Sequence, residues 1–289
     1  MGLSLRELLP RPSVMGVLNV TPDSFSDGGL FIDPRRAASH AERLVREGAA
    51  IIDLGGESTR PGASPISCEE ELARVEPVLE HVVALGVPVS VDTSKAEVAR
   101  RALSLGACMV NDITGLRGDA EMADAAARSG AYVCLMHMQG DPRTMQEAPS
   151  YHDIVTDVRT FLEERVEFAI SRGIAEDRIC VDPGIGFGKT AHHNLELISR
   201  LEELADLGVP VLVGTSRKSF LGRVLGDASA TSGPLAAGLA AAVSAYQAGA
   251  SIVRSHDVRE HVEALRMAAA IECVAHPLQA GQEEPRRSQ

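Results

Sequence analysis

The sequence predicts an α/β fold, and specifically a single eight-stranded (β/α)8 barrel. Eight short apolar runs recur along the chain, and segments with helix-type spacing of apolar residues separate them. Strict alternation of strand and helix produces a parallel sheet, and eight such units close into a barrel. The length of 289 residues also suits one barrel, which typically needs about 250 residues. A doubly wound open sheet is the alternative.

The eight expected strands are apolar enough to be buried on both faces, which is typical of parallel sheets. In chain order they are VMGVL from Val14, AAIIDL from Ala49, VPVSVD from Val87, CMVND from Cys108, YVCLMH from Tyr132, RICVD from Arg178, VPVLVG from Val209 and ASIVR from Ala250.

Capping chemistry marks the ends of the helices between these strands. Asp33-Pro34 is expected to begin one helix, and Gly48 to end it. Three acceptor residues are each followed three positions later by Glu, which predicts N-terminal caps, namely Ser67, Ser94 and Asp257. Glycines suit the C-terminal ends at Gly106 and Gly208. We expect the barrel to occupy residues 1–275 and a disordered tail to occupy residues 276–289.

Composition narrows the classes of function. With 28 Lys and Arg against 40 Asp and Glu, the net charge of −12 argues against binding to nucleic acid or to an anionic membrane. The five cysteines lack any C-x-x-C pair, which favours buried free thiols over a disulfide framework or a zinc site. No apolar stretch approaches the roughly 18 residues of a membrane span. A cytoplasmic location is therefore expected.

Polar residues end nearly every apolar run, at the point where barrels carry their catalytic groups. Any one of them alone could equally be a helix cap or a loop residue, but together they predict an active site. Three of them would offer the mixed donors and acceptors that suit a flat heterocycle, namely Asp92, Asn111 and Asp182. The full set is Asn19, Asp53, Asp92, Asn111, Asp112, His137, Asp182, the cluster Thr215 to Lys218, Arg254 and His256.

A local basic cluster is expected near strands seven and eight, where such barrels often hold phosphate. It consists of Arg217, Lys218 and Arg254, and Arg60 follows the second strand. The alternative is a set of exposed surface cations. The loops NVTPDSFSDGG from Asn19 and GGESTRPGA from Gly55 are turn-rich and polar, as mobile lids are.

Two nucleotide-binding motifs are rejected. The segment DPGIGFGKT ends like a phosphate-binding loop, but Pro183 stands where the first glycine must lie. Its glycines also lack the G-x-G-x-x-G spacing of a dinucleotide site.

Eight ordered motifs resemble those of the bacterial dihydropteroate synthases, across roughly Val14 to Met267. They are NVTPDSFSDGG, IIDLGGESTRPGA, VDTS, VNDI, LMHMQG, DPGIGFGKT, SRKS and RSHDV. The resemblance implies a TIM barrel, usually a homodimer, that uses Mg2+ and is the sulfonamide target. It further implies a folate-pathway transferase that condenses 6-hydroxymethyl-7,8-dihydropterin diphosphate with p-aminobenzoate. The products would be 7,8-dihydropteroate and pyrophosphate.

The resemblance also implies a role for each matching residue. Pterin binding would fall to Asp92, Asn111, Met136, Asp182, Phe187 and Lys218. Diphosphate binding would fall to Asn19, Thr59, Arg60, Arg254 and His256, with Asn19 also meeting the metal. The p-aminobenzoate site would contain Phe25, Thr59, Pro61, Phe187, Lys218 and Ser219. The catalytic groups would be Asp92, Asp182, Lys218 and Arg254.

A dissociative mechanism is expected, in which the pterin carries a cation at its exocyclic carbon while pyrophosphate leaves. Two other functions remain open from the sequence. One is a corrinoid-type methyltransferase with a similar pterin-binding barrel, which gives no reason for the STRPG and SRKS loops. The other is a paralogue that binds pterin without catalysis.

Overall fold

The computed structural model describes residues 2–21, 33–59, 62–141 and 143–275. Eight parallel strands form one sheet in the order β6-β5-β4-β3-β2-β1-β8-β7. A bridge between Val181 and Val211 joins its two ends, so the sheet closes into a barrel. The predicted (β/α)8 fold is confirmed, and the open doubly wound sheet is excluded. The strands are β1 (Ser13–Asn19), β2 (Ile51–Gly55), β3 (Val89–Asp92), β4 (Met109–Asp112), β5 (Tyr132–Met136), β6 (Ile179–Asp182), β7 (Leu212–Gly214) and β8 (Ile252–Ser255).

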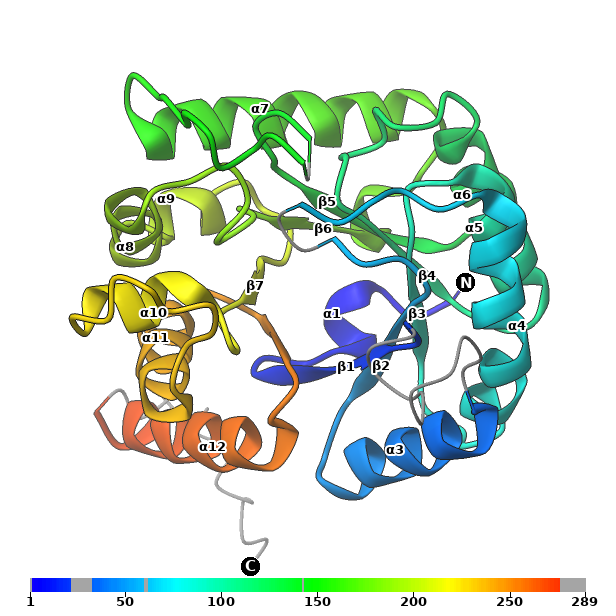
Figure 1. Ribbon diagram of the computed structural model, residues 1–289, viewed down its shortest axis with the longest axis horizontal. Helices are drawn as coiled ribbons and strands as arrows, with labels where there is room; N and C mark the ends of the chain where they lie inside the picture. Colours follow the sequence, from blue (N-terminus) through cyan, green and yellow to red (C-terminus); the bar gives the residue numbers. More distant parts are fainter. Residues whose placement is uncertain (1, 22–32, 60–61, 142, 276–289) are drawn as a thin grey trace, which may run out of the picture.

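Helices surround the sheet in a ring, and the short helix α1 lies within that ring (Figure 1). The described helices are α1 (Leu5–Leu8), α3 (Pro34–Arg46), α4 (Cys68–Val83), α5 (Ala96–Ser104), α6 (Met122–Ser129), α7 (Ile154–Ser171), α8 (Ala191–Ser199), α9 (Glu202–Ala205), α10 (Ser219–Val224), α11 (Leu235–Gln247) and α12 (Val258–Ala275), with a 3-10 turn at Glu176–Arg178.

Most of the predicted helix boundaries hold. Asp33 accepts a hydrogen bond of 2.9 Å from the Arg35 amide at the start of α3. Ser67 accepts one of 3.1 Å from the Glu70 amide at the start of α4. Gly48 has a positive φ of 101°, which ends α3 because glycine enters that region without a steric penalty. These boundaries could be predicted from sequence because each capping side chain and the amide it bonds to lie within one helical turn of each other.

The expected cap at Ser94 is wrong. Helix α5 begins at Ala96, and its N-cap residue Lys95 makes no capping hydrogen bond through its side chain. The Ala96 amide instead donates a 2.9 Å hydrogen bond to Asp119, which lies on the loop between β4 and α6. A long-range acceptor therefore replaces the local one.

Three groups of buried apolar side chains fill the molecule. The largest lies between the sheet and the surrounding helices. A second group fills the barrel interior near the amino ends of the strands, where Leu5 and Leu9 pack with Met15, Ile51 and Leu212. Helix α1 thereby closes the end of the barrel opposite the carboxyl ends of the strands. The third group lies near those carboxyl ends and contains Ile113, Met136, Met138 and Met145, with Phe187 packed against it.

The five cysteines are free, as expected. Cys134 and Cys180 are buried in the barrel interior, whereas Cys273 is exposed on α12, so burial was correct only for part of the set. No helix in the described ranges is long and apolar enough to cross a membrane.

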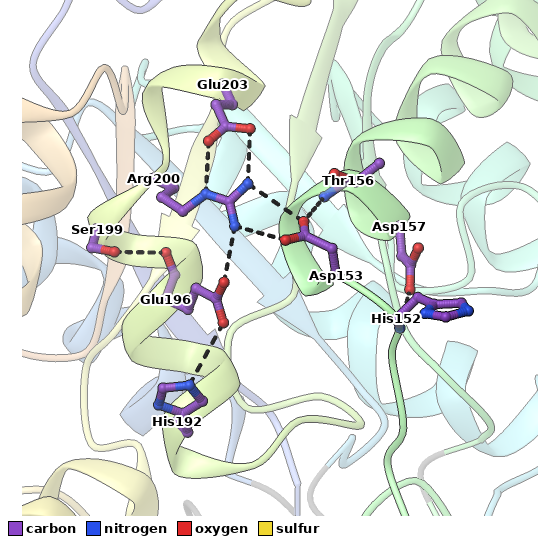
Figure 2. A network of polar contacts seen from close by, with 9 residues as sticks. All are labelled: His152, Asp153, Thr156, Asp157, His192, Glu196, Ser199, Arg200 and Glu203. Carbon is purple, nitrogen blue, oxygen red and sulfur yellow. Dashed lines mark hydrogen bonds and ion pairs between the residues drawn. The ribbon is translucent and has the colours of Figure 1, made fainter.

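A surface network ties α7 to α8 and α9 (Figure 2). The guanidinium of Arg200 contacts Asp153 at 2.9 Å, Glu196 at 2.9 Å and Glu203 at 2.7 Å. Asp153 also caps α7 through the amide of Thr156 at 2.8 Å. One arginine therefore links α7, which precedes β6, to α8 and α9, which follow it.

Candidate active site

A pocket opens at the carboxyl ends of the strands and gathers most of the predicted site residues. Register explains this, because Gly55 pairs with both Asn19 and Asp92, and Asp92 pairs with Asn111. Consecutive strand ends therefore meet at one edge of the barrel. The pocket is lined by Thr59, Asp92, Asn111, Ile113, Met136, Asp182, Ile185, Phe187, Gly214, Lys218 and Arg254.

Two buried carboxylates line this pocket, Asp92 from β3 and Asp182 from β6. Burial raises the pKa of Asp182, while the Gly184 amide, which donates to it at 2.7 Å, and the Lys218 ammonium oppose that rise. Burial also raises the pKa of Asp92, and Arg254 opposes it. The cations Arg254 and Lys218 thus favour the ionised forms of Asp92 and Asp182, and in those forms the two groups can accept hydrogen bonds from a ligand or stabilise positive charge.

Arg254 lines the same pocket as these two carboxylates, although the sequence grouped it with the basic cluster of Arg217 and Lys218. Its Nε donates to Asp53 at 2.6 Å, and its Nη2 donates to Asp92 at 2.8 Å. Burial alone would lower the pKa of Arg254, but the two carboxylates raise it well above its usual range. The guanidinium is therefore a permanent positive charge that contacts the carboxylates of Asp53 and Asp92 directly.

Asp53 is a site residue that the sequence named among the polar strand ends but did not assign to a ligand. It is fully buried on β2 and also accepts a 3.1 Å hydrogen bond from Asn111. A charged residue inside the apolar run AAIIDL was the available signal, because an ionised group at such a position needs a buried partner.

Lys218 lies beside Phe187, with its ammonium 4.3 Å from the centre of the ring. Burial lowers the pKa of Lys218 to about 8, although Asp182 raises it. The contact brings together two residues that the sequence assigned to both substrates. Lys218 immediately precedes Ser219, the first residue of α10.

A hydrogen-bonded group around Ser216 lies just after the carboxyl ends of β7 and β8. Its hydroxyl lies 3.3 Å from His256 Nδ1 and donates to Asp257 at 3.3 Å, and Asp257 pairs with Arg217 at 2.6 Å. Burial, with the neighbouring cation Arg254, lowers the pKa of His256 to about 3. His256 is therefore neutral near pH 7, and it would bind phosphate by a hydrogen bond rather than by charge.

The loop after β2 is anchored by a half-buried lysine, Lys95. Lys95 donates to Glu57 at 2.7 Å and to Glu71 at 2.6 Å, and Glu57 also accepts from the Ile66 amide at 2.9 Å. This fixes the start of the loop that carries Thr59 at the edge of the pocket. The predicted site residues Phe25, Arg60 and Pro61 lie outside the described residues.

A buried lysine, Lys189, braces the loop after β6, and the sequence did not assign it a role. Lys189 donates to His137 Nδ1 at 2.9 Å and to the Phe187 carbonyl at 2.9 Å. Burial lowers the pKa of Lys189 to about 7 and that of His137 to about 2. The lysine of the rejected phosphate-loop motif thus positions Phe187.

A magnesium ion fits this edge only if the substrate supplies most of its ligands. Among the described residues, no group of three His, Cys, Asp or Glu side chains could hold a metal. Oxygen donors do surround Gly55, since a Cβ built there would lie 3.5 Å from Asn19 Oδ1 and 3.6 Å from Asp92 Oδ2. Mg2+ usually takes one or two protein oxygens and completes its shell with phosphate and water, so these residues suit it.

Comparison with known proteins identifies what the chain resembles. The model of the family described as pterin binding enzyme matches residues 15–256. The dihydropteroate synthase of Escherichia coli (strain K12) is 49% identical over 263 residues, which cover 91% of this chain and 92% of that protein. That of Mycobacterium leprae (strain TN) is 46% identical over 263 residues, covering 89% of this chain and 92% of that protein.

Solved structures give the same result. Yersinia pestis dihydropteroate synthase in a sulfonamide drug complex has a TM-score of 0.85 and 46% identity, covering 94% of this chain and 97% of that chain. The Xanthomonas albilineans enzyme in complex with 7,8-dihydropteroate has a TM-score of 0.80 and 43% identity, covering 91% and 94%.

Proposed function

This chain belongs to the dihydropteroate synthase family, and from that premise we propose how its residues condense a dihydropterin diphosphate with p-aminobenzoate. It is a transferase of folate biosynthesis. The observation that carries the residue assignment is the single pocket that gathers Asp92, Asn111, Asp182, Lys218 and Arg254 from five separate segments of the chain.

The pterin ring is held at the bottom of this pocket. Asp92, Asn111 and Asp182 supply acceptors and one amide donor, Lys218 supplies a cationic donor, and Met136 supplies an apolar contact. This mixture matches a flat ring whose edge alternates amide and amine groups.

The reaction begins when the bond between the exocyclic carbon and the diphosphate oxygen breaks. The electron pair leaves with pyrophosphate, and the carbon becomes a cation conjugated to the electron-rich pterin. Asp92 and Asp182 favour that positive charge because they lie in a site of low dielectric. The amine nitrogen of p-aminobenzoate then attacks the carbon and releases one proton to water.

The leaving pyrophosphate is held by the basic end of the pocket. Arg254 supplies charge, His256 supplies a neutral hydrogen bond, and Thr59 lies on the adjacent loop. Mg2+, with one oxygen from Asn19, would neutralise the negative charge that develops on the diphosphate. The residue Arg60 belongs to the same proposed set.

The p-aminobenzoate site is proposed beside Lys218. The Phe187 ring, Thr59 and Ser219 would line it, together with Phe25 and Pro61. A relative from Xanthomonas albilineans has been solved with 4-aminobenzoic acid, which is this substrate.

We also propose that the chain acts as a cytoplasmic homodimer. Three apolar side chains on α12 follow helical spacing and are strongly exposed, Met267 at 64%, Ile271 at 61% and Val274 at 82%. Such a stripe is stabilised when a second copy covers it. Light scattering of the wild-type chain and of Ile271→Glu tests this, and a wild-type monomer would reject it.

The function itself is tested by release of pyrophosphate. The wild-type chain should release it only when the pterin diphosphate, p-aminobenzoate and Mg2+ are all present. A corrinoid-type methyltransferase would release none, and a non-catalytic paralogue would bind pterin in calorimetry without turnover. Unchanged turnover in both Lys218→Ala and Arg254→Ala would overturn the residue assignment.

A further inference from the structure

One oxygen of a fully buried carboxylate serves two residues of the pocket. Asp53 Oδ2 accepts from Arg254 Nε at 2.6 Å and from Asn111 Nδ2 at 3.1 Å. The other oxygen, Oδ1, is buried and has no hydrogen-bond partner among the described residues. Asp53 itself does not line the pocket. It can therefore act on a ligand only through Arg254 and Asn111.

We propose that Asp53 is a positioning residue that orients Asn111 and Arg254 for the pterin diphosphate. The inference rests on the proposed function, because it concerns how two ligand-binding side chains are presented.

The orientation of the Asn111 amide follows from the chemistry of a carboxylate. An ionised carboxylate only accepts hydrogen bonds, so the amide nitrogen and not the amide oxygen must face Asp53. Rotation of the amide by half a turn would bring two acceptors together about 3 Å apart and would lose the hydrogen bond. Asp53 thus fixes which donor and which acceptor of Asn111 remain for the ring.

The guanidinium of Arg254 is held at two points by carboxylates from different strands. Asp53 on β2 accepts a hydrogen bond from Nε, and Asp92 on β3 accepts one from Nη2 at 2.8 Å. A pterin that hydrogen-bonds to Asp92 competes for the second point but not for the first. Asp53 therefore keeps Arg254 in the pocket while its Nη groups turn toward the diphosphate. A lysine could not replace it, because the fixed fork of the guanidinium is what allows both contacts.

A purely structural role for Asp53 would be to neutralise the half-buried Arg254, and the two roles predict different effects when mutations are combined. If Asp53 acts through its two partners, its replacement should matter less once a partner is gone. If Asp53 only supports the fold, its replacement should lower the binding affinity by the same factor whether or not a partner is present. Asp112 is the matched control, because it is an equally buried strand-end carboxylate that bonds to Thr114 and Leu116 of its own loop.

The experiment measures binding of the dihydropterin diphosphate with Mg2+ by calorimetry in a double-mutant cycle. Asp53→Asn should weaken binding about tenfold in the wild-type background, and about threefold or less in Arg254→Ala or Asn111→Ala. It should raise the KM for the pterin diphosphate and leave the KM for p-aminobenzoate unchanged. Asp112→Asn should change affinity by the same factor in all three backgrounds.

Equal losses from Asp53→Asn in every background would overturn the proposal, as would unchanged affinity in the wild-type background. Asp53→Ser provides a second variant, and failure of both to fold would assign Asp53 to the fold and reject a positioning role. Turnover of the wild-type chain is measured first. Its absence would reject the proposed function, whereas active wild-type enzyme with an additive cycle would reject only this inference.

Discussion

Raising the pH should remove the positive charge of Lys218 and with it the affinity for the pterin diphosphate. Lys218 lies among Asp182, Asp92 and Arg254, and burial lowers its pKa to about 8. The ammonium is present below that pH and is lost above it. Because kcat/KM reports the free enzyme, its pH profile should follow the protonated fraction of this lysine.

The size of the effect follows from that pKa. The protonated fraction is about nine-tenths at pH 7 and about one-tenth at pH 9, so kcat/KM for the pterin diphosphate should fall about tenfold between them. An unperturbed lysine, with a pKa near 10.4, would give a change of only a few per cent.

Initial rates of pyrophosphate release between pH 6.5 and 9.5, at saturating p-aminobenzoate, give the profile. The control is Lys218→Arg, which keeps a charge that does not titrate in this range. The fall should disappear in that variant even if its activity is lower. A fall that persists in Lys218→Arg would assign it to another group, such as Lys189 with its pKa of about 7, and would refute the argument.

Three further outcomes are expected. Gly184→Ala should lower the free energy of unfolding, measured in urea, by about 3 kcal/mol or more, because the φ of Gly184 is +68° and a Cβ there would overlap the His137 carbonyl. The control Gly173→Ala, where φ is +89° but the surrounding space is open, should lower it by only about 1 kcal/mol. Equal losses in the two variants would contradict this prediction. Lys95→Met should lower the free energy of unfolding by about 3–5 kcal/mol, because it leaves the buried Glu71 without its ion-pair partner. Adding Glu71→Gln should restore part of this stability, and no recovery in the double variant would count against the pairing. Chelation of Mg2+ should stop pyrophosphate release without lowering the melting temperature, and undiminished turnover in chelator would exclude a metal requirement.

The fold could be predicted because buried parallel strands leave a local signal. Each strand of this barrel is a mainly apolar run, and most runs have a polar residue at or next to their carboxyl end. Caps such as Ser67 also depend on neighbours within one turn. The predicted cap at Ser94 failed because the acceptor that replaced it, Asp119, lies 23 residues from the amide it serves.

Several connections within the site could not be predicted, because they join distant parts of the chain. Asp53 and Arg254 are 201 residues apart, and Lys189 and His137 are 52 apart. Only closure of the barrel brings these pairs together. The sequence therefore indicated which residues surround the pocket, but not that Arg254 contacts Asp92 or that Asp53 holds it there.

The seal that α1 forms at the lower end of the barrel has a consequence for the order of events in one turnover. Leu5 and Leu9 close that end, so in the part of the chain that the structure describes, the pocket opens only at the strand carboxyl ends. A ring held by Asn111 and Asp182 lies at the closed side of this pocket, and whatever binds above it blocks its departure. With the pterin bound as proposed, we therefore expect it to arrive before p-aminobenzoate, and we expect pyrophosphate to leave by the route through which both substrates came in.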